Sequence, residues 1–182
     1  MQTGITLRRV NTLIRKTLDV RCIGDWVRIC CMSSRPEPSM PPPMFAQLLG
    51  YSGLIPFLGL SAAAWMVRGA WQAQLLYALL AYGATILSFL GAVHWGLALR
   101  DPAAPPRFLL LWGVVPSLLA WIALLWGAAG GLWILAVGLW ACFAVDRTVY
   151  PRFKAEGWLG MRLALTVVAS LSCIAAAVLP IR

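Results

Sequence analysis

Ionisable side chains are scarce in this chain. Of its 182 residues only six are acidic, and His94 is the single histidine. A zinc site needs several such ligands at suitable spacing, and the five cysteines form no CxxC pair. The sequence also lacks a nucleophile motif, a Walker loop and a dinucleotide fingerprint. We therefore expect no enzymatic activity, no cofactor, no metal and no disulfide.

Charge is low in general, and apolar residues replace it. Charged residues make up 12% of the chain and hydrophobic residues 61%, against about 25% and 45–50% in globular proteins. Four stretches contain no charged residue at all: 45–67, 69–99, 108–145 and 163–181. A soluble protein would have to expose much of this surface to water. We conclude that lipid is the solvent of this chain.

The lengths of these stretches give the number of spans. A membrane-spanning helix needs about 20 apolar residues. The first, second and fourth stretches each fit one span, but the third is too long for one helix. It contains GAAGG at 127–131, and glycine clusters favour a turn. The sequence thus predicts an all-α integral membrane bundle of five helices, at about 45–67, 73–99, 108–126, 132–149 and 161–179.

Residues 1–43 differ from the rest. They hold seven Lys/Arg and three Asp/Glu, and they end in a proline-rich run, SSRPEPSMPPP. Proline lacks a backbone donor and restricts the residue before it, so we expect a disordered segment. The sequence leaves two further interpretations open: a wrongly chosen start, with Met40 or Met44 as the true beginning, and a basic organelle-targeting segment. We expect the membrane domain to cover residues 44–182.

Basic residues also predict the orientation. The N-terminus and the two loops at 100–107 and 147–162 would share one side of the membrane. That side holds six Lys/Arg outside the first 43 residues, and the other side holds Arg68 and Arg182. Lys and Arg gather on the cytoplasmic side, so the N-terminus is expected in the cytoplasm and the C-terminus outside. The net charge of +9 then reflects topology, and we expect no nucleic-acid partner.

The second predicted helix carries a stripe of small residues. Ala84, Ser88, Ala92 and Gly96 recur every four residues. Because lipid gives no hydrophobic force between helices, small side chains support packing through close backbone approach. The stripe predicts a contact face for the first helix, the third helix or a second subunit. Chance in a chain rich in alanine and glycine is the alternative.

His94 and Trp95 form the most distinctive candidate site. They stand on the second helix about 7–8 Å inside its cytoplasmic end, at 1.5 Å per residue. An ionisable group at that depth is a functional candidate. The topology places Asp146 and Arg162 at the same end of the bundle. Such a group could bind a ligand such as a tetrapyrrole or relay protons, or it could fix packing through an interhelical hydrogen bond.

Two prolines lie near the middle of predicted helices. Pro56 ends GLIP in the first helix, and Pro116 ends GVVP in the third. Proline removes a ladder hydrogen bond, so we expect a kink at each position. Matched broken helices can also mark a repeated transporter fold, but the remaining helices align poorly. Kinks that serve packing are the better interpretation.

Several runs resemble a known family. LLGYSGLIPFLGL, YGATILSFLGAVHWGLAL, WGVVPSLLAW and the pair Asp146-Arg147 followed by MRLALT are similar to an uncharacterised family of small bacterial membrane proteins. That family also contains the mitochondrial transmembrane protein 69 of animals. The similarity covers about residues 45–179 and is most specific in SFLGAVHWG. It implies a multi-helix membrane protein without an established activity. The characteristic positions that it implies are Gly53, Pro56, Tyr82, Gly83, Ser88, Phe89, Gly91, His94, Trp95, Gly96, Pro116, Ser117, Asp146 and Arg162.

Two functions remain open at this point. The first is a structural or assembly role within a membrane complex, with membrane protein partners or a second copy of the chain. The second is binding or transport of a small hydrophobic or tetrapyrrole-like ligand through His94 and Asp146, with Trp95 and Arg162. We expect a bacterial inner membrane, or the mitochondrial inner membrane if the chain is eukaryotic.

Overall fold

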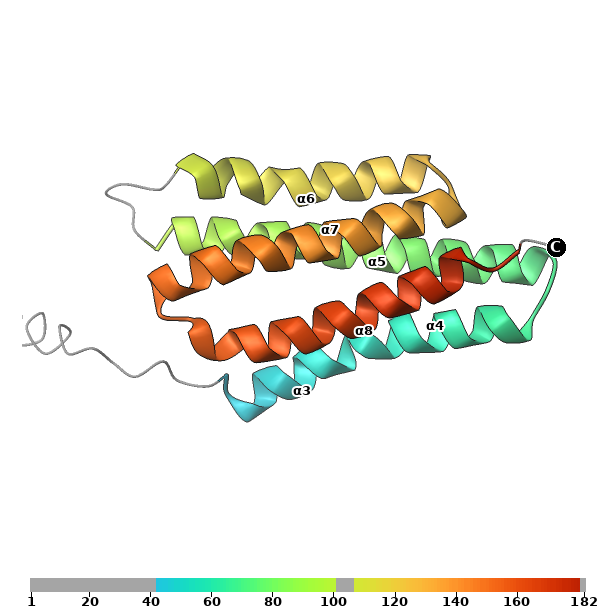
Figure 1. Cartoon of the computed structure of the whole chain (residues 1–182), viewed down its shortest axis with the longest axis horizontal. Helices are drawn as coiled ribbons and strands as arrows, with labels where there is room; N and C mark the ends of the chain where they lie inside the picture. The colour runs from blue at the N-terminus through green and yellow to red at the C-terminus, as the bar shows by residue number, and fades with distance from the viewer. Residues whose placement is uncertain (1–41, 101–106, 181–182) are drawn as a thin grey trace, which may run out of the picture. The chain divides into compact units, whose positions relative to one another are not determined.

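A computed structural model describes residues 42–100 and 107–180 (Figure 1). The predicted disordered segment, apart from its last two residues, lies outside the described residues. Throughout the described part the regular structure is helical. Its elements are α3 (Met44–Ser52), α4 (Leu54–Met66), α5 (Ala70–Ala98), α6 (Arg107–Leu125), α7 (Ala128–Val149), η1 (Tyr150–Phe153), η2 (Glu156–Trp158) and α8 (Leu159–Ala177).

These elements confirm the five-span, all-α class. Five helical segments within the described residues are long and apolar enough to cross a membrane. They run side by side along the long axis of the bundle (Figure 1). Large apolar side chains such as Leu111, Met66 and Val137 face outward. Outward apolar side chains are expected where lipid replaces water as the solvent.

Helix α5 forms the centre of the bundle. It packs on α4, α6 and α7, while α8 packs on α7 and α4. Leu79, Leu80 and Leu87 of α5 are fully buried, and they share a core with Leu132 and Leu135 of α7. This arrangement brings the ends of α5, α7 and α8 together at one end of the bundle.

The first span is broken at Gly53, which separates α3 from α4. Pro56 stands in the first turn of α4 and has no N–H for the carbonyl of Ser52, four residues before it. The kink expected at Pro56 is therefore realised as a break three residues earlier. The Tyr82 hydroxyl of α5 donates a hydrogen bond of 2.8 Å to the Gly53 carbonyl. On the N-terminal side of the break, α3 packs on α8.

Pro116 behaves differently. Helix α6 continues without interruption from Arg107 to Leu125 through this proline. Its ring is buried against α5, where a Cβ atom on Gly91 would stand 3.4 Å from the Pro116 Cδ atom. The two prolines thus have different local surroundings: the helix is interrupted near Pro56 and continuous through Pro116.

The turn between α6 and α7 is shorter than predicted. Within 127–131 only Gly127 adopts a positive φ, of 82°, and α7 begins at Ala128 instead of 132. Gly130 and Gly131 lie inside the helix. A Cβ atom on Gly131 would stand 2.3 Å from the Ala123 carbonyl oxygen. These glycines therefore permit close packing of α7 on α6, and the expectation that the whole cluster forms the turn was wrong.

The small-residue stripe of α5 does not follow one neighbouring helix. Ala84 is buried and Ser88 half-buried, but Ala92 and Gly96 are exposed. A Cβ atom on Gly96 would have no neighbour within 4 Å. The backbones of α5 and α6 approach each other closely at Gly91 instead, one residue off the stripe.

Candidate functional site

His94, Asp146 and Arg162 meet inside the bundle. His94 Nε2 lies 3.2 Å from Asp146 Oδ1. Arg162 donates to the other carboxylate oxygen, Oδ2, from Nε at 2.8 Å and from Nη2 at 2.5 Å. The exposed fractions are 1% for His94, 1% for Asp146 and 8% for Arg162. We call these three residues the buried triad.

Helix ends bring the buried triad together. His94 stands one turn before the end of α5, about 6 Å from it at 1.5 Å per residue. Asp146 lies in the last turn of α7, and Arg162 lies in the first turn of α8. Between these two helices, η1 and η2 reverse the chain, with Lys154 in the left-handed conformation at φ 55°. The short connection sets aspartate and arginine against each other.

The Asp146–Arg162 pair is a charge-assisted double hydrogen bond. Two donors of one guanidinium on one carboxylate oxygen compensate part of the cost of burying both charges. Removing one partner alone would leave a buried charge without its counter-ion. This pair therefore ties α8 to α7 at the end of the bundle.

The contact between His94 and Asp146 is different. His94 Nδ1 lies 3.1 Å from the Leu90 carbonyl oxygen, which can only accept a hydrogen bond. Nδ1 therefore carries a hydrogen. Nε2 and Asp146 Oδ1 are within ion-pair distance, yet their alignment is not that of a hydrogen bond, and neither atom has another hydrogen-bond partner. Two buried polar atoms thus face each other at 3.2 Å without forming a hydrogen bond.

Trp95, the fourth residue of the predicted site, is not in the buried triad. Its Nε1 donates a hydrogen bond of 2.8 Å to the Leu110 carbonyl of α6. Its ring lies against Gly113, where an added Cβ atom would collide with it. Neighbouring residues on a helix point about 100° apart, so Trp95 serves the α5–α6 contact while His94 faces α7.

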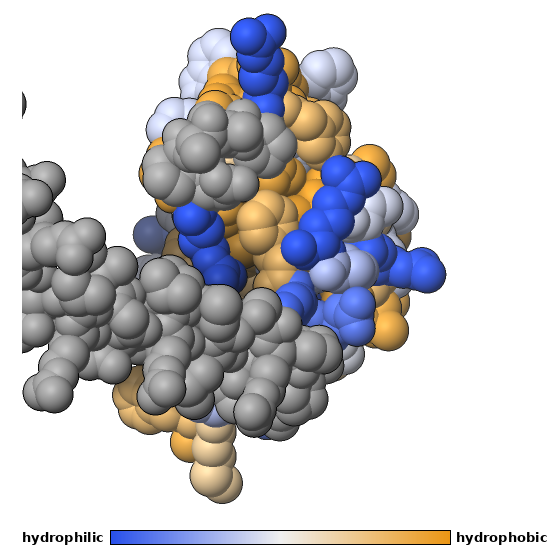
Figure 2. All heavy atoms as spheres, turned by 90° about the vertical axis from the view of Figure 1, so that its left-hand side faces the viewer, coloured by the Kyte–Doolittle hydropathy of each residue, from blue (hydrophilic) through white to orange (hydrophobic). Residues whose placement is uncertain are grey.

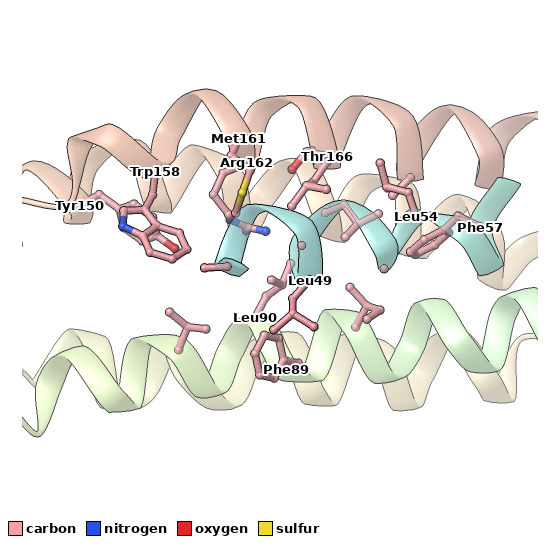
Figure 3. A pocket seen from close by; sticks show the side chains of 18 residues that line it. Leu49, Leu54, Phe57, Phe89, Leu90, Tyr150, Trp158, Met161, Arg162 and Thr166 are labelled. Atoms are coloured by element: carbon pink, nitrogen blue, oxygen red, sulfur yellow. The ribbon is translucent and has the colours of Figure 1, made fainter. Parts of the chain in front are cut away.

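A cavity of about 450 Å³ adjoins the buried triad (Figure 3). It lies between α3, α5 and α8. Helix α3, which precedes the break at Gly53, packs on α8 and leaves this space beside α5. Arg162 is the one charged residue of its wall. The wall is formed by Ala46, Leu49, Gly50, Gly53, Leu54, Phe57, Ile86, Phe89, Leu90, Val93, Leu139, Tyr150, Trp158, Met161, Arg162, Leu165, Thr166 and Ala169.

Sequence reasoning missed this cavity. Its lining is apolar, and such residues carry no signal that separates a cavity wall from a packed core or a lipid-facing surface. The available hint was the spacing of Gly53 and Pro56, which predicts a break in the first span. Thr166, one turn after Arg162, was also missed; it is 1% exposed and its hydroxyl has no hydrogen-bond partner.

Metal ligation finds no support in the described part of the chain, where no three His, Cys, Asp or Glu side chains gather. Cys142 and Cys173 are free, buried thiols in α7 and α8. Chemistry at this site therefore depends on the buried triad and the cavity.

The fold and the site define a five-span helical membrane protein with a buried histidine–aspartate–arginine cluster beside an apolar cavity. The chain belongs to the family described as "Protein of unknown function (DUF3429)", whose model matches residues 42–178. This confirms the resemblance seen in the sequence.

Two relatives are named Transmembrane protein 69. The protein of Xenopus tropicalis is 39% identical over 138 residues, which are 72% of this chain and 53% of the frog protein. That of Mus musculus is 28% identical over 142 residues, 75% of this chain and 57% of the mouse protein. The chain thus spans about half the length of these relatives. No solved structure matches it.

Proposed function

We propose that this protein binds a small hydrophobic or amphiphilic molecule taken from the bilayer. The observation that carries the proposal is the apolar cavity with Arg162 in its wall. Small-molecule sites are typically cavities of about 300–1,000 Å³, mostly apolar, with few polar groups that orient the ligand. The cavity of about 450 Å³ has this character. No reaction is required of it, so the proposed role is non-enzymatic.

Entry from the lipid phase is supported by the exposure of the lining residues. Leu49 of α3 is 59% exposed and Phe89 of α5 is 64% exposed, so these two side chains stand at an open edge. Phe57 and Leu139 are buried and form the inner wall. Phe89 lies about 14 Å from the end of α5, at 1.5 Å per residue. The opening is therefore at the depth of the hydrocarbon.

The geometry argues against ligation of a tetrapyrrole by His94. Its Nδ1 is bonded to the Leu90 carbonyl, and its Nε2 faces Asp146. Neither nitrogen is directed into the cavity, and His94 is not part of its wall. Of the three residues of the buried triad, a ligand in the cavity would contact Arg162.

Filling the cavity tests the proposal. Val93 lines the cavity, whereas Val137 of α7 is 67% exposed on the outer surface. We expect wild-type protein and Val137→Trp, purified in mild detergent, to carry a tightly held lipid or other amphiphile detectable by native mass spectrometry. Val93→Trp should lack it. Equal retention by both variants would contradict binding in this cavity.

A structural or assembly role is the second candidate. Ala92 and Gly96 form an exposed strip of small residues on α5, and such residues permit close approach of another helix in lipid. If a partner helix packs on this strip, the larger side chain of Gly96→Leu should prevent its close approach, and a protein subunit that co-purifies with the wild type should be lost. Unchanged protein composition after that substitution would contradict this candidate.

We also propose that the end of the bundle with the buried triad faces the cytoplasm, in a bacterial inner membrane, or the matrix of a mitochondrion. Arg100, Arg107, Arg147, Arg152 and Lys154 belong to this end, whereas Arg68 lies at the other. Figure 2 looks onto this end and shows hydrophilic side chains gathered around an apolar body. The positive-inside rule supports this orientation.

A further inference from the structure

We propose that the cavity takes a monoanionic amphiphile, whose charge is balanced by a proton held between His94 and Asp146. The inference rests on the proposed function and names the chemical class of the ligand.

The first step concerns the proton. His94 Nδ1 carries a hydrogen because it faces the Leu90 carbonyl at 3.1 Å. With only that hydrogen, the lone pair of Nε2 would face a carboxylate oxygen at 3.2 Å, in a place where neither atom has another partner. A buried polar atom without a hydrogen-bond partner is costly, and two such atoms face each other here. One proton between Nε2 and Oδ1 replaces the repulsion between two facing acceptors by an attraction, because the pair then lies at ion-pair distance.

The second step is the charge count, which does not depend on which atom holds the proton. Arg162 contributes +1, the Asp146 carboxylate −1 and the added proton +1, so the protonated triad carries one net positive charge. Of the described residues only one other, Glu156, is acidic, and it is exposed. Within the bundle this positive charge therefore has no second carboxylate to balance it.

The other titratable groups around the triad do not supply that negative charge. Cys142 and Tyr150 lie one turn before and one turn after Asp146 on α7 and η1, close enough for their charges to interact with it. A thiol and a phenol are neutral at neutral pH. Helix α4 has no titratable residue, and the only one on α6 is Arg107 at its first position. A buried net charge is costly, so a bound anion would stabilise the protonated triad.

The third step locates the anion. Arg162 lines the cavity while its Nε and Nη2 bond to Asp146. A guanidinium has five N–H donors, of which Asp146 accepts two; the Tyr150 hydroxyl also lies within hydrogen-bonding reach of Arg162, so no more than three are left for a headgroup. In Figure 3 Tyr150 and Trp158 lie toward one end of the cavity, Phe57 lies toward the other, and Arg162 lies between them. The acidic headgroup would contact Arg162, and the apolar tail would extend toward Phe57.

The test uses full-length protein in phosphatidylcholine nanodiscs and two probes that share a tail. Hexadecanesulfonate keeps its negative charge at every pH used, and hexadecanol has none, so any pH dependence of sulfonate binding arises from the protein. We expect the sulfonate to bind at least about tenfold more tightly than the alcohol, the worth of a charge-assisted hydrogen bond. Its affinity should fall as the pH rises and the triad loses its proton.

His94→Gln isolates the proton. Glutamine can still donate to Asp146, but it cannot titrate, so the triad stays neutral. We expect this variant to fold and to bind both probes alike, without pH dependence. Gln72→Leu is the control, because it changes another buried polar residue of α5 that is outside the cavity wall; it should keep the wild-type preference. Proton uptake by wild-type protein on sulfonate binding at alkaline pH gives a readout that needs no variant.

The outcomes separate the two proposals. Equal affinities of both probes for wild-type protein would overturn this inference and leave the proposed function standing, whereas absence of binding by either probe would overturn both. A sulfonate preference retained by His94→Gln, or binding without proton uptake at any pH, would overturn the role of the proton. Displacement of the sulfonate by phosphatidylglycerol supports a bilayer lipid as the ligand, and displacement by palmitate supports a free acid. Displacement by neither means that the sulfonate binds as an adventitious additive only, which overturns the inference.

Discussion

Gly91 of α5 and Gly113 of α6 approach each other backbone to backbone. A Cβ atom added to Gly91 would stand 2.3 Å from the Gly113 carbonyl oxygen, and one added to Gly113 would collide with the Trp95 ring. The contact allows α6 to lie directly on the central helix. The hydrogen bond from Trp95 to the Leu110 carbonyl links the same two helices next to this contact. The bundle thus obtains a close helix crossing from two residues without side chains.

The first prediction tests this crossing. Gly91→Ala should destabilise the protein by about 1–3 kcal/mol, the usual cost of overpacking, because the obstacle is backbone and cannot rotate away. Gly96→Ala is the matched control: its Cβ atom meets open space, and alanine favours a helix over glycine. Its free energy of unfolding should be unchanged or slightly raised. Both values can be measured by unfolding titrations in mixed micelles, and equal losses would contradict the crossing.

The second prediction concerns the buried ion pair. At alkaline pH, where no proton is held between His94 and Asp146, Arg162→Met would leave the Asp146 carboxylate buried without its counter-ion, at a cost of about 3–5 kcal/mol. Adding Asp146→Asn to that variant should recover part of the loss, since no charge then remains unpaired. Arg147→Met removes an exposed arginine from the same region and should cost under about 0.5 kcal/mol. Thermal unfolding in detergent would rank the variants; a double variant no more stable than Arg162→Met would argue against the pairing.

The third prediction concerns the break in the first span. Tyr82→Phe keeps the edge-to-face packing on Phe57, whose ring centroid lies 5.2 Å away, but loses the hydrogen bond to the Gly53 carbonyl. We expect a loss of about 0.6–1.5 kcal/mol. Tyr77→Phe, on the exposed face of α5, should leave stability unchanged. Hydrogen exchange of the amides around Gly53 should rise in the first variant only; protection equal to wild type would contradict a holding role for Tyr82.

The fourth prediction concerns orientation. Reporter fusions in the loop at 101–106 and between α7 and α8 should be active in the cytoplasm, and a fusion after residue 182 should be active outside. The reason is the count of six basic residues against two on the two sides. A fusion after residue 182 that works only in the cytoplasm would contradict five spans in this orientation.

Much of the architecture could be predicted because membrane thickness fixes the length of a span. Charge-free runs bounded by Arg68, Arg100 and Arg107 give three helices whose ends differ from the structure by a few residues. The error at 127–131 has a local cause. Glycine is consistent both with a turn and with close helix contact, and only the neighbouring carbonyl of Ala123 decides between them.

The site was partly predictable for the same reason. Once the spans and their directions are known, His94, Asp146 and Arg162 must lie at similar depth at one end of the bundle. Depth alone does not give the direction of a side chain around its helix. Trp95 shares that depth but faces α6, so only the packing of the helices shows that it lies outside the buried triad.

The sequence by itself determined the solvent of this protein, the number of its spans and the end of the bundle at which its ionisable residues lie, because these follow from local hydrophobicity and charge along the chain. Only the tertiary structure decided that Gly91 crosses Gly113, that His94 Nε2 faces Asp146 Oδ1, and that a cavity opens between α3, α5 and α8 beside Arg162. Such features depend on which helix faces separate segments present to one another. That choice is made by contacts between residues far apart in the chain, which no local pattern records.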